Sequence, residues 1–101
     1  MIPLNIKAAI DEYVDHGHPV GGFVNAVLCN DLQEAVVRAD EVSLACIVAI
    51  CKYVFNLTPA PCWGSKEKVR AWMSLHKDQP ELAERVASGD RQARKDYGKE
   101  N

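Results

Sequence analysis

The chain has 101 residues, of which 48% are hydrophobic and 26% charged, and its formal net charge at pH 7 is -2. A chain of this length forms one domain and can bury a core without metal or disulfide support. The slightly acidic charge gives no general attraction to nucleic acid or to an anionic membrane. The first residues lack the basic and apolar regions of a secretory signal, so we expect an intracellular protein.

The four cysteines have no spacing that indicates a metal or redox site. They are Cys29, Cys46, Cys51 and Cys62, and no two of them form a CxxC pair. The three histidines also lack a metal-finger spacing relative to them. A bond between Cys46 and Cys51 is disfavoured, because five residues along a helix place the two side chains on diverging faces. We therefore expect reduced structural thiols, no metal and no cofactor.

The first predicted element is an amphipathic helix that begins after Asn5, its expected N-cap. Its apolar side chains recur with helical spacing at Ile6, Ala9, Ile10, Tyr13 and Val14. Gly17 followed by Pro19 is the order typical of a helix end. His16 and His18 flank this end, and we interpret them as exposed cap residues in preference to ligands.

Two adjacent glycines, Gly21 and Gly22, open a short helix that is predicted over residues 23–29. They form either a structural turn or a cradle in which an anion approaches the N–H groups of the helix. Asn30 and Asp31 then interrupt the chain. Asp31 and Glu34 have the spacing of a capping box, which predicts another helix start.

Arg38 and Asp40 mark a corner between two predicted helices. Asp40 is expected to cap the helix that follows it, because its carboxylate can accept from the first N–H groups. Arg38 either pairs with Asp31 or Asp40, or binds an anionic ligand or a partner carboxylate. The sequence leaves both alternatives open.

The most apolar stretch covers residues 42–57 and reads VSLACIVAICKYVFNL. Only Ser43, Lys52 and Asn56 are plainly polar in it, so no polar face runs along its length. A helix that is apolar on nearly all sides is typical of a buried position. The stretch is shorter than a membrane span. We expect it to be the buried central helix of the domain.

A proline-stiffened loop follows and ends at Trp63, Gly64 and Ser65. Ser65 is expected to cap a helix over residues 66–76. Trp63 either closes the core as a lid or stacks on a base, an aromatic side chain or a cation. A last helix is predicted to start near residue 79, and the charged segment 89–101 is expected to be mobile.

These elements predict an all-α fold, because no stretch shows the alternation of a strand. We expect a compact bundle of five or six short helices around the buried central helix at about 41–57. Residues 1–88 would form the single helical domain, and residues 89–101 a charged C-terminal tail.

Several motifs occur in a fixed order. They are GGF-x-x-AVL-x-NDL-x-x-A-x-x-RAD over residues 21–40 and CWGS over residues 62–65. In this pattern the chain resembles a family of small uncharacterised proteins encoded by bacteriophages and prophages. The resemblance implies expression in the cytoplasm of a bacterial host. It implies no particular activity and no catalytic residues.

The candidate ligand-binding residues stand at the predicted helix starts and corners. They are Gly21, Gly22, Asn30, Asp31, Arg38, Asp40, Trp63, Gly64 and Ser65. Together they offer backbone N–H groups, one guanidinium and an aromatic face, which is chemistry suited to a nucleotide. The competing interpretation is that the same residues only cap helices and form turns.

We therefore expect a non-enzymatic binding protein that counters host antiphage defence. It would sequester a small anionic nucleotide signal, or occupy a host protein, and apolar helix faces make a homo-oligomer reasonable. One alternative is a DNA-binding transcriptional regulator, which the acidic balance disfavours. The other is a small hydrolase that pairs Cys62 with His16 or His76. No membrane partner is expected.

Overall fold

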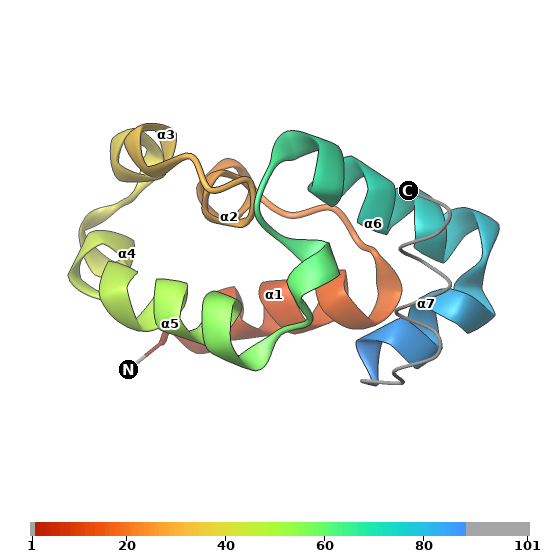
Figure 1. The fold of residues 1–101 in the computed structure, drawn as a ribbon. Helices are drawn as coiled ribbons and strands as arrows, with labels where there is room; N and C mark the ends of the chain where they lie inside the picture. The colour runs from red at the N-terminus through yellow and green to blue at the C-terminus, as the bar shows by residue number, and fades with distance from the viewer. Residues whose placement is uncertain (1, 89–101) are drawn as a thin grey trace.

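The computed structural model describes residues 2–88, and every regular element in this range is a helix, which confirms the all-α prediction (Figure 1). In chain order the elements are α1 (Leu4–His16), α2 (Gly22–Leu28), α3 (Leu32–Arg38), α4 (Glu41–Ala45), α5 (Ile47–Leu57), the 3-10 helix η1 (Ala60–Cys62), α6 (Lys66–Asp78) and α7 (Pro80–Ala87). The predicted tail, residues 89–101, lies outside the described residues.

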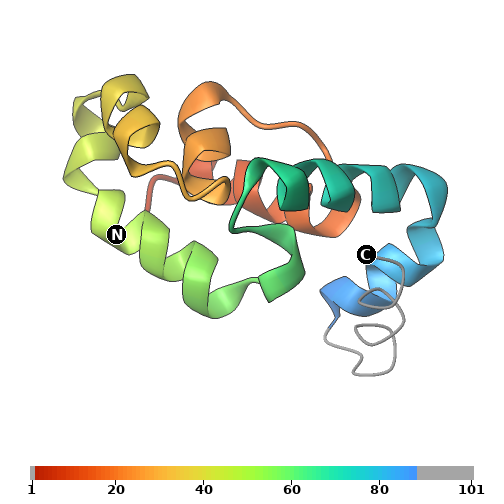
Figure 2. The same cartoon turned by 45° about the horizontal axis from the view of Figure 1, so that its top comes forward.

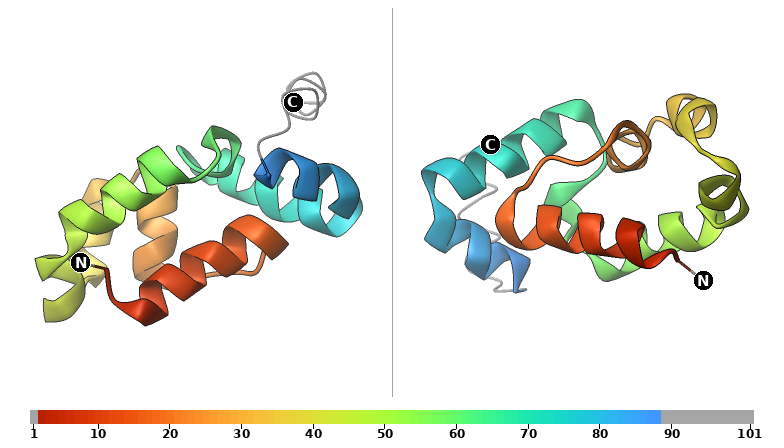
Figure 3. Two further views of the ribbon diagram at one scale, coloured as in Figure 1. Left: turned by 90° about the horizontal axis from the view of Figure 1, so that it is seen from below. Right: turned by 180° about the vertical axis from the view of Figure 1, so that it is seen from behind.

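The helices form an elongated molecule with extents of 40 × 22 × 20 Å. At one end lie α3 and α4, with α2 packed against α3, and at the other end the antiparallel pair α6 and α7 (Figure 2). Helices α1 and α5 run between the two ends and lie beside each other when the molecule is seen from below (Figure 3). No helix within residues 2–88 has the length and apolar character needed to cross a membrane.

Three helices begin at the side-chain caps that the sequence predicts. Asp31 accepts a hydrogen bond from the N–H of Glu34, Asp40 from the N–H of Ser43, and Ser65 from the N–H of Lys68. Each cap satisfies a donor that the first turn of a helix leaves without a partner.

The predicted cap at Asn5 is wrong, because α1 begins at Leu4 with Pro3 in the cap position. The predicted end of this helix is confirmed, since Gly17 follows it in the left-handed conformation with φ 71°. A Cβ atom at Gly17 would also lie 2.6 Å from Cβ of His76. Glycine at this position therefore allows both the turn and the close approach of α6.

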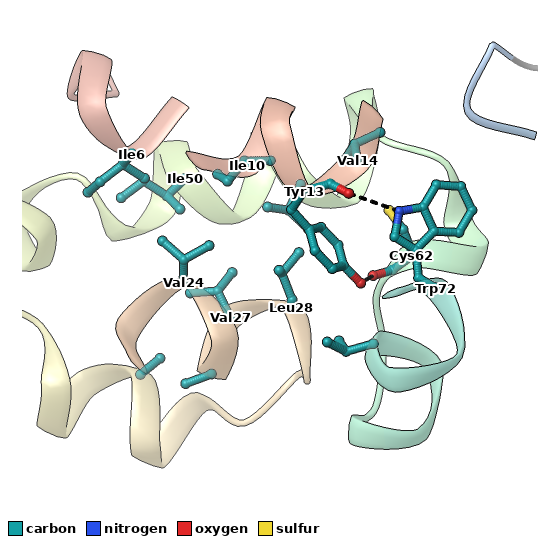
Figure 4. Close-up of a cluster of buried hydrophobic side chains, with 14 of the residues drawn as sticks. Ile6, Ile10, Tyr13, Val14, Val24, Val27, Leu28, Ile50, Cys62 and Trp72 are labelled. Carbon is teal, nitrogen blue, oxygen red and sulfur yellow. Dashed lines mark hydrogen bonds between the residues drawn. The ribbon is translucent and has the colours of Figure 1, made fainter. Parts of the chain in front are cut away.

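Tyr13 and Trp72 form the centre of the core, and both are fully buried (Figure 4). The Tyr13 hydroxyl donates to the carbonyl of Cys62 at 2.7 Å, and the Trp72 indole donates to the carbonyl of Tyr13 at 3.1 Å. The two bonds join α1, η1 and α6, and they satisfy polar atoms that would be costly to bury alone. The remaining core residues come from α1, α2, α5, α6 and α7, with Ala35 from α3 and Cys62 from η1.

The predicted buried helix at about 41–57 needs correction. It is divided at Cys46, whose φ of -107° and ψ of 6° separate α4 from α5, so the described range holds seven α-helices. Only one side of it enters the core, through Ser43, Ile50 and Val54, while Val48 is 65% exposed. Apolar composition did not ensure burial, because the short helices around it cover only one side. Helix α1 packs against α2, α6 and α7 instead.

A polar contact holds α5 against α1. The Tyr53 hydroxyl donates to the Asp11 carboxylate, which also accepts from the Lys7 ammonium at 2.7 Å. Burial raises the pKa of Asp11, but the hydrogen bonds from Lys7 and Tyr53 outweigh it, so the net pKa of this carboxyl is lowered. Asp11 therefore stays ionised and keeps both contacts at neutral pH.

Candidate functional site

A groove of about 490 Å³ lies between one side of α2, one side of α3 and the start of α6. It brings together segments that are distant in the sequence. Its lining residues are Gly22, Asn25, Ala26, Cys29, Asp31, Glu34, Arg38 and Lys66. Three of the nine predicted ligand-binding residues, Gly22, Asp31 and Arg38, are among them.

Arg38 reaches the groove because it lies across Gly22. A Cβ atom built on Gly22 would lie 2.9 Å from Cδ and 3.0 Å from Nη1 of Arg38. The missing side chain therefore leaves the space that the arginine occupies. The neighbouring Gly21 is different, since a Cβ there would meet nothing within 4 Å.

The two acidic side chains in the groove already have partners. Glu34 accepts a hydrogen bond from Nε of Arg38, one turn along α3, and Asp31 caps the same helix. The contact with Glu34 uses Nε of Arg38, and within residues 2–88 the two terminal nitrogens of the guanidinium make no hydrogen bond or ion pair, which leaves them for a ligand. Glu34 thus holds the arginine in place through an exposed pair of modest strength.

Lys66 supplies a second positive charge at the first position of α6, after the Ser65 cap. Among residues 2–88 it makes no ion pair. The positive end of the helix dipole lies at the same place, which favours an anion. The groove therefore offers an ammonium and part of a guanidinium, while its carboxylates are engaged with the protein.

Cys29 lines the groove but is not an activated nucleophile. Partial burial raises the pKa of its thiol, an effect that the nearby Lys66 charge opposes without reversing. The thiol is therefore protonated at neutral pH, and a protonated thiol is a poor nucleophile. Among the described residues that line the groove, Arg38 and Lys66 can bind an anion, and Cys29 is not activated to attack it.

Four predicted residues serve the fold in the conformations seen here. Asn30 forms the turn after α2 with a positive φ of 59°, and Asp40 caps α4. Gly64, with φ 126°, donates its N–H to the Leu28 carbonyl at 2.7 Å. Ser65 caps α6 beside the groove-lining Lys66. The Gly64 bond fixes the start of α6 against the end of α2, and so positions Lys66.

Trp63 lies outside the groove and packs on Phe55, with ring centroids 4.7 Å apart. It covers the core at the end of α5, as in the lid interpretation. Its Nε1 atom is buried and has no hydrogen-bond partner within the described part of the chain. The tryptophan and the groove are therefore separate features.

Asn25, Cys29, Glu34 and Lys66 were not among the predicted ligand-binding residues, although all four line the groove. The spacing of Gly22, Asn25 and Cys29 places them on one side of α2, a signal that the sequence contains. The position of Lys66 depends on how α6 packs, which no local pattern encodes.

A second cleft, of about 660 Å³, lies between the end of α1 and the pair α6–α7. It is lined by Asp15, His16, His18, His76, Pro80, Glu84, Ala87 and Ser88. The His76 ring donates from Nε2 to the Val14 carbonyl at 3.0 Å, and burial lowers the pKa of this imidazole. Within residues 2–88, no group of three or more side chains could hold a metal ion.

The pairing of Cys62 with His16 or His76, considered for a hydrolase, does not fit the structure. Cys62 is fully buried, and its thiol donates to the Pro59 carbonyl at 2.9 Å. A nucleophile must reach its substrate, and this thiol lies inside the core.

Searches against protein-family models, curated protein sequences and solved structures found no match to the chain.

Proposed function

We propose that this protein is a non-enzymatic binding protein that holds a small anionic ligand of the nucleotide type. The groove between α2, α3 and α6 supports the proposal most directly, because Arg38 and Lys66 both line it. A phosphate oxygen accepts well from both groups, and the free terminal nitrogens of a guanidinium suit a phosphate.

The size of the groove fits this class of ligand. Pockets for small molecules usually measure about 300–1,000 Å³, and a volume of about 490 Å³ suits one nucleotide unit. The Asn25 amide offers both a donor and an acceptor for a base or a sugar. The protonated Cys29 thiol and the engaged carboxylates favour retention of the ligand over its conversion.

The resemblance to small phage proteins suggests a biological role for such binding. A protein that sequesters a nucleotide signal of antiphage defence in the bacterial cytoplasm needs affinity and no turnover. A protein that instead occupies a host protein would not need the groove. Variants within the groove therefore separate these two roles.

The test is titration calorimetry with 3′,5′-cyclic AMP, 3′,5′-cyclic GMP and a set of cyclic dinucleotides. We expect at least one to bind and to be recovered intact after the protein is denatured. Lys66→Ala should weaken that binding about tenfold or more, because it removes a charge-assisted hydrogen bond. Lys77→Ala is the control, since Lys77 lies on the last turn of the same helix, outside the groove.

Three results would contradict the proposal. A converted nucleotide would identify an enzyme. Absence of binding across the panel, or equal binding by the Lys66→Ala variant, would remove the groove as the site.

A further inference from the structure

The surface formed by α3, α4 and α5 is unusually apolar. It carries eight of the nine large hydrophobic side chains that are exposed within the described residues. We call these eight residues the exposed apolar surface: Leu32, Val36, Val37, Val42, Leu44, Val48, Phe55 and Leu57. The exposed fraction is highest at Leu57, Val37 and Leu32, which are each about 70% exposed.

A regular ridge runs through this surface along α4 and α5. It consists of Leu44, Val48, Cys51 and Phe55, whose spacing of four, three and four residues is that of a helix-pairing seam. The break at Cys46 does not end the hydrogen bonding. The Cys46 N–H donates to the Val42 carbonyl, and the Ile50 N–H donates to the Cys46 carbonyl. The ridge therefore continues from α4 into α5.

The charges beside the ridge are self-complementary. Glu41 stands at its start and Lys52 near its other end, about three helical turns apart. Within residues 2–88 neither of them makes an ion pair. When two such ridges pack antiparallel about a two-fold axis, Glu41 of each copy faces Lys52 of the other.

We propose that the exposed apolar surface is the interface of a homodimer in which the α4–α5 ridges of two copies pack antiparallel. The ridge has the spacing of a helix-pairing seam, and the charge pattern beside it pairs with itself. A membrane surface fits less well, because α4 and α5 contain one lysine and no arginine, whereas helices that bind anionic lipid are rich in both. The inference does not depend on the nucleotide groove, which has different lining residues.

Sedimentation equilibrium of the full chain over a concentration series tests the interface. We expect a mass of twice 11.2 kDa for the wild type. Val48→Asp should raise the dissociation constant more than about tenfold, because it buries a carboxylate in the seam. Val48 is well exposed in the single chain, so circular dichroism should show an unchanged helix content.

Charge reversal tests the antiparallel arrangement. Glu41→Lys and Lys52→Glu should each weaken the dimer several-fold, and the double variant should restore it close to the wild-type value. Lys77→Glu on α6 is the control and should leave the dissociation constant unchanged. A wild-type protein that is monomeric at every concentration would overturn the proposal, even if another protein binds this surface. A dimer that tolerates Val48→Asp would equally overturn it.

Discussion

The two ends of the molecule bury their apolar side chains to different extents. Helices α6 and α7, together with α1, enclose the fully buried Trp72 and Tyr13, and no large hydrophobic side chain of α6 or α7 is exposed. The end formed by α3 and α4 buries only Ala35 and Ser43. The end formed by α6 and α7 therefore buries its large apolar side chains within the single chain. The end formed by α3 and α4 leaves apolar side chains exposed to solvent.

The hydrophobic residues of the two ends therefore contribute differently to folding. Burial of a large apolar side chain contributes about 1.5–3 kcal/mol, which the residues around Trp72 supply to folding. The exposed side chains of α3, α4 and α5 contribute little burial free energy to the folding of the single chain. Large hydrophobic side chains therefore stabilise the fold at one end of the molecule. At the other end they are exposed, and the proposed dimer would bury them.

The largest expected contrast is between Trp72→Ala and Val48→Ala. Trp72→Ala should lower the free energy of unfolding by about 3–5 kcal/mol, because it leaves a cavity and removes the hydrogen bond from the indole to the Tyr13 carbonyl. Val48→Ala should change the stability of the single chain by about 0.5 kcal/mol or less. Urea unfolding of dilute protein, followed by circular dichroism, measures both.

If the Trp72→Ala variant does not fold, a milder substitution tests the same prediction. Trp72→Phe keeps an aromatic ring but loses the N–H, and it should cost about 1–3 kcal/mol. Similar losses for Trp72→Phe and Val48→Ala would contradict the contrast between the two ends.

The sequence predicted the features that depend on local spacing. The caps at Asp31, Asp40 and Ser65 and the end of α1 at Gly17 each depend on a few neighbouring residues, and all four are confirmed. The buried face of α1 also follows its helical spacing, since four of the five predicted positions are buried and Ala9 is half-buried.

Features that depend on distant packing were not predicted. The stretch over residues 42–57 is apolar on all sides, and its composition cannot show how much of it other helices cover. The groove has the same origin, because Lys66 and Arg38 line one groove only after the start of α6 is fixed against the end of α2. The Gly64 N–H, bonded to the Leu28 carbonyl, fixes that meeting point.

A smaller effect is expected at the well-packed end, where stability should depend on pH through His76. Burial lowers the pKa of His76 in the folded state below its ordinary value of 6.5. The unfolded chain therefore binds more protons than the folded one as the pH falls below about 6.5, so stability decreases there. Thermal unfolding from neutral pH to about pH 5 should show a falling melting temperature, and His76→Gln should reduce the slope. An unchanged slope in the variant would assign the pH dependence to other groups.

A pair of glycine variants is expected to change stability least and to test nucleotide binding in the groove most directly. Gly22→Ala places a Cβ 2.9 Å from Cδ of Arg38, so the arginine must move away from the groove. Alanine favours the helix by roughly 0.5–1 kcal/mol, which offsets the cost of moving an exposed side chain. We therefore expect nearly unchanged stability and nucleotide binding that is weaker by about fivefold or more, in the range of one lost charge-assisted contact.

Gly21→Ala is the matched control, because its Cβ would meet nothing within 4 Å, and it should bind nucleotide as the wild type does. If both variants bind nucleotide equally well, the position of Arg38 against α2 has no part in recognition.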